Sequence, residues 1–201
     1  MHISDGVLSP YVIGAGWAVA IPALALTIRR LKTDRVGAYG VVAAAFFAGS
    51  TIHVPIGPFS MHLLLTGIAG LLLGWGALTV VTVGLLLQAL LIGFGGLTVL
   101  GVNISIMALP GAIMGVIGRQ WMKQVSAKKR PWIGSLIGGG TILISTILLY
   151  VTLSTTHTAL MPLAKLVFLG HIPIAIVEGI ISFWLVHFLQ KVKPSLLGVS
   201  S

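Results

Sequence analysis

The feature of this sequence that most restricts its fold is a series of long apolar runs separated by short basic loops. A helix needs about 20 apolar residues to cross a bilayer, and about 17 is the practical minimum. Seven runs lie near or above that length, at residues 11–28, 36–52, 61–76, 78–94, 99–118, 132–153 and 167–189. Only 7% of the residues are charged, against about 25% in a soluble domain. We therefore expect an all-α, polytopic membrane protein with about seven transmembrane helices. Glycine-rich seams at 74–76 and 93–96 leave six or eight as alternatives.

The basic residues support this arrangement. All except Lys165 fall into three clusters, at residues 29–35, 119–130 and 191–193. Short loops rich in Lys and Arg stay on the cytoplasmic side of a membrane. Four predicted spans separate the first two clusters and two separate the last two, and even numbers place all three on one side. We expect an extracytoplasmic N-terminus and a cytoplasmic C-terminus. The net charge of +9 is thus attributed to membrane topology rather than to a nucleic-acid partner.

Five of the six histidines then share the outer side. His2 lies at the outer end of the chain, His53 and His62 flank one outer connection, and His157 and His171 flank another. Histidines gathered on one face suggest a metal or proton site. Each also has an ordinary interpretation: His53, His62 and His171 as structural or interface residues, and His157 as a solvated loop residue. The chain has no cysteine, which excludes disulfides and thiolate ligands.

The beginning of the chain, MHISDGVLSP, has none of the features of a signal peptide. We expect it to act as a metal-chelating segment, residues 1–10, that folds back into a single domain spanning residues 1–201. A free amine at Met1, the amide nitrogen of residue two and the imidazole of His2 can close small chelate rings around one ion. A second histidine would supply a fourth nitrogen. A planar set of four nitrogens favours Cu(II) or Ni(II) over Zn(II). Position alone does not choose between His53 and His62 for this role.

Few other polar groups lie within the predicted spans. Glu178 is the only carboxylate there, and its alternatives are a hydrogen-bonded structural acid or a contact to a mobile element or partner. Gln88 and Asn103 are expected to tie helices together by hydrogen bonds. We find no P-loop, dinucleotide fingerprint or nucleophile with its base. The chain is therefore expected to be neither an ATPase nor another enzyme, and to bind no organic cofactor.

Several segments resemble a known family. MHISDGVLSP, PIGPFSMHLLLTGIAGLLLGW, LLLQALLIGFGGLTVLGVNISIMALPG and IPIAIVEGII are similar, in order, to the cobalt/nickel-binding membrane component of energy-coupling-factor importers, the CbiM/NikM family. The resemblance covers residues 1–10, 53–112 and 170–181. It implies capture of a divalent metal as the transported substrate. The implied ligands are Met1, His2 and His62, and the PIGPFSMHLLLTG segment resembles the nickel branch, so Ni(II) is favoured and Co(II) is the alternative.

The resemblance also implies partners and a location. They are a transmembrane coupling subunit, two ABC-type ATPase subunits and often a small accessory membrane protein, in the prokaryotic cell (inner) membrane. Asp5, His53 and Asn103 are candidates for supporting the ligands. One position departs from the family, because many relatives carry a histidine where this chain has Phe94. The competing interpretations are an importer component for another small molecule, with incidental histidines, and an intramembrane metallohydrolase.

Overall fold

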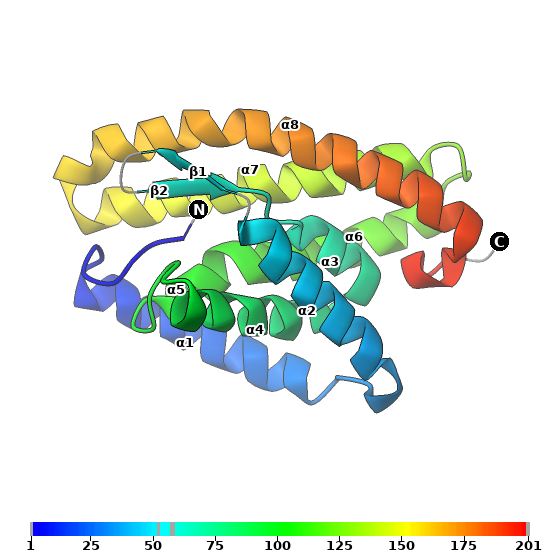
Figure 1. The fold of residues 1–201 in the computed structure, drawn as a ribbon, viewed down its shortest axis with the longest axis horizontal. Helices are drawn as coiled ribbons and strands as arrows, with labels where there is room; N and C mark the ends of the chain where they lie inside the picture. Colours follow the sequence, from blue (N-terminus) through cyan, green and yellow to red (C-terminus); the bar gives the residue numbers. More distant parts are fainter. Residues whose placement is uncertain (1, 52, 57–58, 200–201) are drawn as a thin grey trace.

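The computed structural model describes residues 2–51, 53–56 and 59–199, which form a bundle of helices with one short hairpin (Figure 1). The helices are α1 Pro10–Ile28, α2 Val36–Thr51, α3 Thr66–Leu73, α4 Gly76–Leu91, α5 Leu100–Asn103, α6 Leu109–Lys123, α7 Arg130–Thr156 and α8 Met161–Val192. The hairpin consists of β1 His53–Ile56 and β2 Phe59–His62. A π-helical segment, Ile104–Ala108, joins α5 to α6, and 3₁₀ turns occupy Thr33–Arg35, Thr158–Leu160 and Pro194–Leu197.

Four helical segments in the described part of the chain are long and apolar enough to cross a membrane. They are α1, the continuous run Leu100–Lys123, α7, and α8 with its preceding turn. Counting α5 to α6 as one run, the described residues form seven helical segments, as the apolar runs predict. The helices α2 and α4, at 16 residues each, are slightly short for a full span. The helical membrane bundle is confirmed, although only four of the seven segments meet the length of a span.

The predicted span at 61–76 is wrong. Antiparallel pairing of β1 with β2 aligns His53 with His62 and keeps the chain extended through His62. Leu65 then adopts a left-handed conformation, φ 55°, and the eight-residue helix α3 begins only at Thr66. Gly74, with φ 61°, ends it. His62 is therefore a strand residue rather than the start of a helix. Proline in the hairpin, which cannot continue a helix interior, favours this outcome.

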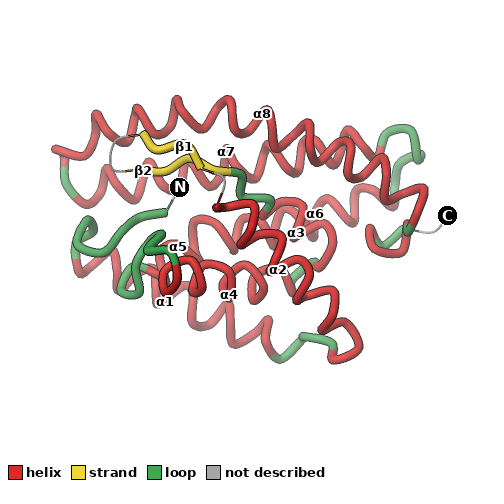
Figure 2. The backbone as a smooth tube through the Cα atoms, in the orientation of Figure 1, coloured by secondary structure: helices red, strands yellow, loops and turns green. Residues whose placement is uncertain are grey.

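Close backbone contacts hold the helices together. The antiparallel pair α7 and α8 runs the length of the molecule (Figures 1 and 2). The helices α3 and α6 cross at Gly70, where a Cβ atom would fall 2.0 Å from the carbonyl oxygen of Gly111. The helix α1 lies against α5, and Trp17 fills the space that a side chain at Gly101 would need. Small residues at crossings are the usual device for packing membrane helices.

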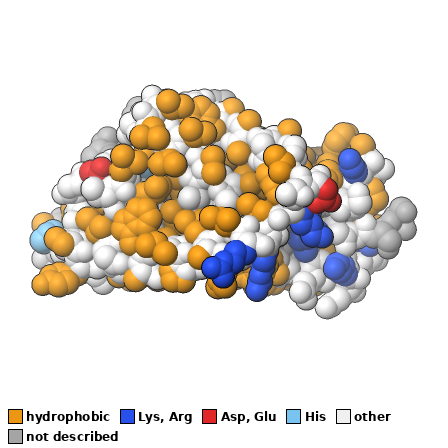
Figure 3. Space-filling model, turned by 90° about the horizontal axis from the view of Figure 1, so that it is seen from below, with side chains coloured by type: hydrophobic (Ala, Val, Ile, Leu, Met, Phe, Trp, Pro, Cys, Tyr) orange, Lys and Arg blue, Asp and Glu red, His pale blue; other side chains and the backbone are white. Residues whose placement is uncertain are grey.

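The two ends of the bundle differ in chemistry. The connection α1–α2, the connection α6–α7 and the end of α8 carry the three basic clusters, and they meet at one end (Figure 1). Figure 3 shows Lys and Arg gathered toward that end, while apolar side chains cover much of the remaining surface. The exposed apolar residues include Ile21, Leu90, Leu148 and Ile176 on four different helices. Hydrocarbon is the solvent that suits such a surface. The hairpin and the turn between α7 and α8 lie at the opposite end (Figure 2).

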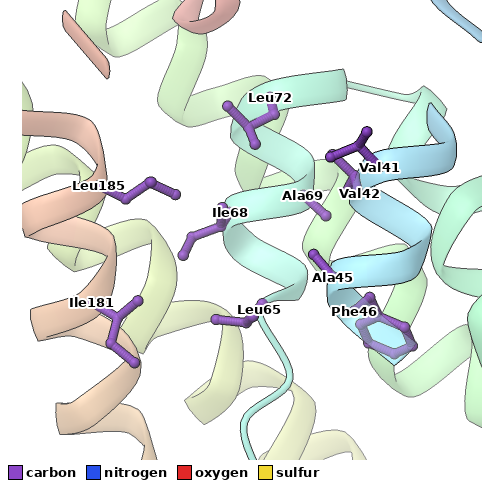
Figure 4. A pocket seen from close by; sticks show the side chains of 10 residues that line it. All are labelled: Val41, Val42, Ala45, Phe46, Leu65, Ile68, Ala69, Leu72, Ile181 and Leu185. Carbon is purple, nitrogen blue, oxygen red and sulfur yellow. The ribbon is translucent and has the colours of Figure 1, made fainter. Parts of the chain in front are cut away.

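An apolar groove opens between α2 and α8, and α3 forms its floor (Figure 4). Its volume is about 210 Å³. Val41 and Phe46 line it from α2, Ile181 and Leu185 from α8, and Leu65 stands at the end next to the hairpin. Leu65 also belongs to the turn that follows His62, so the groove lies next to that turn.

Candidate metal centre

The N-terminal segment, residues 2–9, is attached to the bundle by the side-chain amide of Asn103. The backbone N–H of Ile3 donates to Oδ1 of Asn103 at 3.1 Å, and Nδ2 of Asn103 donates to the carbonyl oxygen of Ile3 at 3.0 Å. Ile3 has no exposed surface and Asn103 is 1% exposed. The side chain of Asn103 thus pairs with this residue as a neighbouring strand would. The bond expected to tie helices together instead fastens the N-terminal segment to the end of α5.

A second attachment comes from Asp5. Its carboxylate accepts hydrogen bonds from the backbone N–H groups of Leu97, Thr98 and Val99, at 3.1–3.3 Å, and from the hydroxyl of Thr98. These N–H groups lie in the loop that leads into α5, so the carboxylate fastens the N-terminal segment to that loop. The hydroxyl of Thr98, with its backbone neighbours, lowers the pKa of Asp5. The carboxylate therefore stays charged at neutral pH.

Two glycines let the segment approach this closely. A Cβ atom on Gly96 would fall 2.1 Å from the Asp5 carboxylate. Gly95 has φ 83°, and a Cβ there would meet the Asn103 amide and the His2 ring. The loop containing them is anchored from α1, since the indole of Trp17 donates to the carbonyl oxygen of Thr98 at 2.9 Å. The segment 94–103 therefore forms a cradle for residues 2–5, and this cradle sets the position of His2.

His2 and His62 meet in the interior. Their rings are stacked with centroids 4.9 Å apart and planes 21° apart, and Nε2 of His62 lies 3.1 Å from Nδ1 of His2. His2 is 7% exposed and His62 is 3% exposed. The strand β2 brings His62 to this point, and the cradle brings His2. Residues 60 positions apart in the sequence thus present two ring nitrogens to one another.

The protonation of these rings determines what the pair can bind. Nδ1 of His62 lies 2.8 Å from the carbonyl oxygen of Leu63. A carbonyl only accepts, so Nδ1 carries the proton and Nε2 of the neutral ring has a free lone pair. Burial lowers the pKa of His62 to about 3 and that of His2 well below its ordinary value. Both rings are neutral near pH 7, as metal ligands must be.

The spacing of the two nitrogens suits adjacent ligands of one ion. Two nitrogens each about 2.0 Å from a metal are about 2.8 Å apart at a right angle and about 3.3 Å apart at a tetrahedral angle. The separation of 3.1 Å falls between these values. Within residues 2–51, 53–56 and 59–199, no three His, Asp or Glu side chains gather closely enough to hold a metal.

The other candidates lie around this pair. Met1 is outside the described residues. Phe94 stacks beside His62, with centroids 6.4 Å apart, and tilts against His2 at 6.1 Å. His53 is exposed, and its ring meets Phe94 edge-on, with centroids 4.8 Å apart, rather than stacking with the pair.

The more distant polar residues have separate roles. His157 is exposed at the end of α7. His171 is buried in α8, where its Nδ1 contacts the carbonyl oxygen of Val167. Nε2 of Gln88 donates to the hydroxyl of Ser50 at 2.6 Å. This bond joins α4 to α2, as expected of an amide within the membrane.

Sequence reasoning did not reveal two of the groups around His62. One is the carbonyl of Leu63, which selects the tautomer of His62. The other is Glu178, whose Oε1 accepts the N–H groups of Leu64 and Leu65. Glu178 stands out in the sequence as the only acid in a span, but nothing in the sequence indicates that it contacts residues more than 110 positions away.

Known proteins resemble this chain over nearly its whole length. Residues 2–196 match the family model CbiM, described as the cobalt uptake substrate-specific transmembrane region. A metal transport protein of Haemophilus influenzae is 37% identical over 202 residues, which covers 98% of this chain and 97% of that protein. A fused nickel transport protein, NikMN, of Archaeoglobus fulgidus is 31% identical over 212 residues, or 98% of this chain and 68% of that protein.

Solved structures give the same result. A crystal structure of a transition metal transporter superposes with a TM-score of 0.82 at 26% identity, covering 96% of this chain and 93% of that one. A truncated transition metal transporter, at 24% identity and a TM-score of 0.82, shares the fold. The family match extends over nearly all of the described bundle, including both attachments of the N-terminal segment. This chain therefore belongs to the CbiM family, the cobalt uptake substrate-specific transmembrane region.

Proposed function

We propose that this chain captures Ni(II) as the substrate of an ATP-driven energy-coupling-factor importer. The observation that carries the proposal is the buried contact of 3.1 Å between Nδ1 of His2 and Nε2 of His62. The free amine of Met1 and the amide nitrogen of residue two complete a set of four nitrogens with these rings. The chelate requires Met1 to be the mature N-terminus, with nothing attached to its amine.

Nickel is favoured over cobalt on chemical grounds. An amine, a deprotonated amide and a His2 ring nitrogen closing adjacent chelate rings tend toward one plane, which suits Ni(II). The near-parallel rings of His2 and His62, 21° apart, are compatible with neighbouring positions in such a set. The name of the Archaeoglobus fulgidus relative, a nickel transport protein, points the same way. Co(II), as in the name of the family model, is the second candidate.

Asp5 and Asn103 would support the ligands without touching the metal. Their hydrogen bonds to the cradle and to Ile3 fix where the first two residues lie. Groups that orient metal ligands in this way typically change affinity by about 10- to 100-fold when removed. Phe94 and His53 would close the site on its outer side.

The same proposal covers topology and partners. The basic clusters at one end favour a cytoplasmic C-terminus in the prokaryotic inner membrane, with the metal site at the extracytoplasmic end. Energy for transport would come from two ABC-type ATPase subunits through a transmembrane coupling subunit, with a small accessory membrane protein in some assemblies. This division of labour suits a sequence without a nucleotide-binding motif.

The test is calorimetric titration of the purified chain in detergent with Ni(II) and, separately, Co(II). We expect tight 1:1 binding of Ni(II), weaker binding of Co(II), and a large loss of affinity in His62→Ala. His157→Ala, which removes an exposed histidine away from the pair, should bind as the unaltered chain does. Absence of tight Ni(II) binding by the unaltered chain would overturn the proposal, and tighter Co(II) binding would reverse the choice of metal.

A further inference from the structure

Glu178 is an acidic side chain placed in the middle of α8 with no exposed surface. Its Oε1 accepts the backbone N–H of Leu64 at 2.5 Å and that of Leu65 at 2.8 Å. Both N–H groups belong to the turn between β2 and α3, where no helical partner exists for them. Burying a carboxylate is costly unless it is hydrogen-bonded, so these two hydrogen bonds stabilise both Glu178 and the turn.

The peptide group between Leu63 and Leu64 contacts both Glu178 and the ring of His62. The N–H of Leu64, which donates to Glu178, and the C=O of Leu63, which contacts Nδ1 of His62 at 2.8 Å, are the two ends of one planar amide. Holding the N–H in place therefore also holds the carbonyl. That carbonyl keeps the proton on Nδ1 and leaves the lone pair of Nε2 directed at His2. A continuous path of hydrogen bonds thus runs from α8 to the ring.

The backbone of the turn supports the same interpretation. Leu65 has φ 55° and is the only residue other than glycine with a positive φ among those the structure describes. A left-handed conformation is strained for a leucine, and it persists only where the surroundings enforce it. The backbone of Leu65 is held by Glu178, and its side chain lies in the groove that Ile181, less than one turn further along α8, also lines (Figure 4). One stretch of α8 therefore fixes this residue twice.

We infer that Glu178 is a positioning residue for His62, acting through the Leu63–Leu64 peptide group to set the tautomer and direction of the imidazole. The inference rests on the proposed function for its consequence, which is Ni(II) affinity. Its structural part, the tautomer of His62, belongs to the metal-free protein and can be measured independently. Glu178 does not touch the metal; it affects Ni(II) affinity through the tautomer and orientation of His62.

The experiment compares three substitutions with one control. Glu178→Gln keeps an oxygen that can accept both N–H groups, Glu178→Asp withdraws the carboxylate by about 1.5 Å, and Glu178→Leu removes the acceptor. Ser182→Ala is the control: Ser182 is equally buried and one turn along the same face of α8, against Gly138. Each chain is examined metal-free by ¹⁵N NMR of labelled histidine, with the His62 signals assigned from His62→Gln, and is then titrated with Ni(II).

We expect a predominantly Nδ1–H tautomer for His62 in the unaltered chain, Glu178→Gln and Ser182→Ala. In Glu178→Leu the Nε2–H tautomer should become substantial and Ni(II) affinity should fall by about 10- to 100-fold. Glu178→Asp should show the same change in smaller degree, and it carries the test if Glu178→Leu does not fold. An unchanged tautomer in both Glu178→Leu and Glu178→Asp would overturn the inference, and so would a loss of affinity in Glu178→Gln as large as in Glu178→Leu. If the unaltered chain binds no Ni(II), the proposed function fails, while the tautomer comparison still decides the role of Glu178.

Discussion

Replacing Asn103 with Ala tests how the N-terminal segment is held. The change removes both hydrogen bonds to Ile3, at 3.1 and 3.0 Å, in a residue with no exposed surface. A buried polar group without a partner costs about 1–3 kcal/mol, so the two groups together cost about 2–6 kcal/mol. The metal-free segment can avoid this cost by moving out to water. Metal binding must then bring it back against that cost.

The expected result follows from these values. At about 1.4 kcal/mol per factor of ten, the lower figure corresponds to about 30-fold weaker Ni(II) binding. Asn103→Asp should fall between the unaltered chain and Asn103→Ala, because a carboxylate accepts from the N–H of Ile3 but cannot donate to its carbonyl. The assay is calorimetric titration with Ni(II) in detergent, with circular dichroism to verify the helical fold.

Ser105→Ala is the matched control. Its hydroxyl lies on the same helical run and bonds the carbonyl oxygens of Gly16 and Gly101, so its loss should lower thermal stability but leave Ni(II) affinity within about threefold. A folded Asn103→Ala chain that binds Ni(II) as tightly as Ser105→Ala does would show that Asn103 does not hold the N-terminal segment.

Three further predictions concern the cradle, the buried rings and a helix crossing. Gly96→Ala places a Cβ 2.1 Å from the Asp5 carboxylate, so it should weaken Ni(II) binding as Asp5→Ala does. The double variant should bind Ni(II) no more weakly than the single variant with the lower affinity. Additive losses of affinity would show that the two changes act separately. Below about pH 6.5 the metal-free chain should lose about 1.4 kcal/mol of stability per pH unit for each buried histidine. The unfolded rings take up protons in this range, whereas His62, with its pKa lowered to about 3, does not. Thermal midpoints between pH 7 and 5 measure this loss, and an equal slope in His62→Gln would contradict it. Gly115→Ala, whose Cβ would lie 2.0 Å from the backbone of Gly70, should lower the thermal midpoint sharply. Gly140→Ala, whose Cβ would meet only Met114 at 3.6 Å, should raise the midpoint slightly. Equal effects would argue against the close crossing of α3 and α6.

The helices could be predicted from the sequence because their signal is local. Runs of apolar residues without charges indicate spans one at a time, and basic loops then indicate which ends lie together. The structure agrees for α1, for the continuous run Leu100–Lys123, for α7 and for α8. The failure at 61–76 has a non-local cause, since β1 pairs with β2 and keeps the apolar residues near His62 extended. An apolar run alone does not distinguish a strand followed by a short helix from a span.

The candidate site shows the same division. The chelating groups at the start of the chain indicate His2, and the family resemblance indicates His62; the structure brings their rings together. The sequence indicates Asp5 and Asn103 as supports, but their partners, the N–H groups before α5 and the backbone of Ile3, appear only once the chain is folded. Glu178 was noticed for being an acid in a span. Its connection to His62 depends on one peptide group and on a left-handed leucine, neither of which has a signature in the sequence.

The most direct test of the account is the addition of one residue before Met1. The extension converts the terminal amine into an amide and leaves every described side chain unchanged, including His2, His62 and their attachments. We expect Ni(II) binding, measured by calorimetry, to be severely weakened while the thermal midpoint of the metal-free chain is little altered. Ni(II) affinity equal to that of the unextended chain would contradict the claim that the N-terminal amine is a ligand.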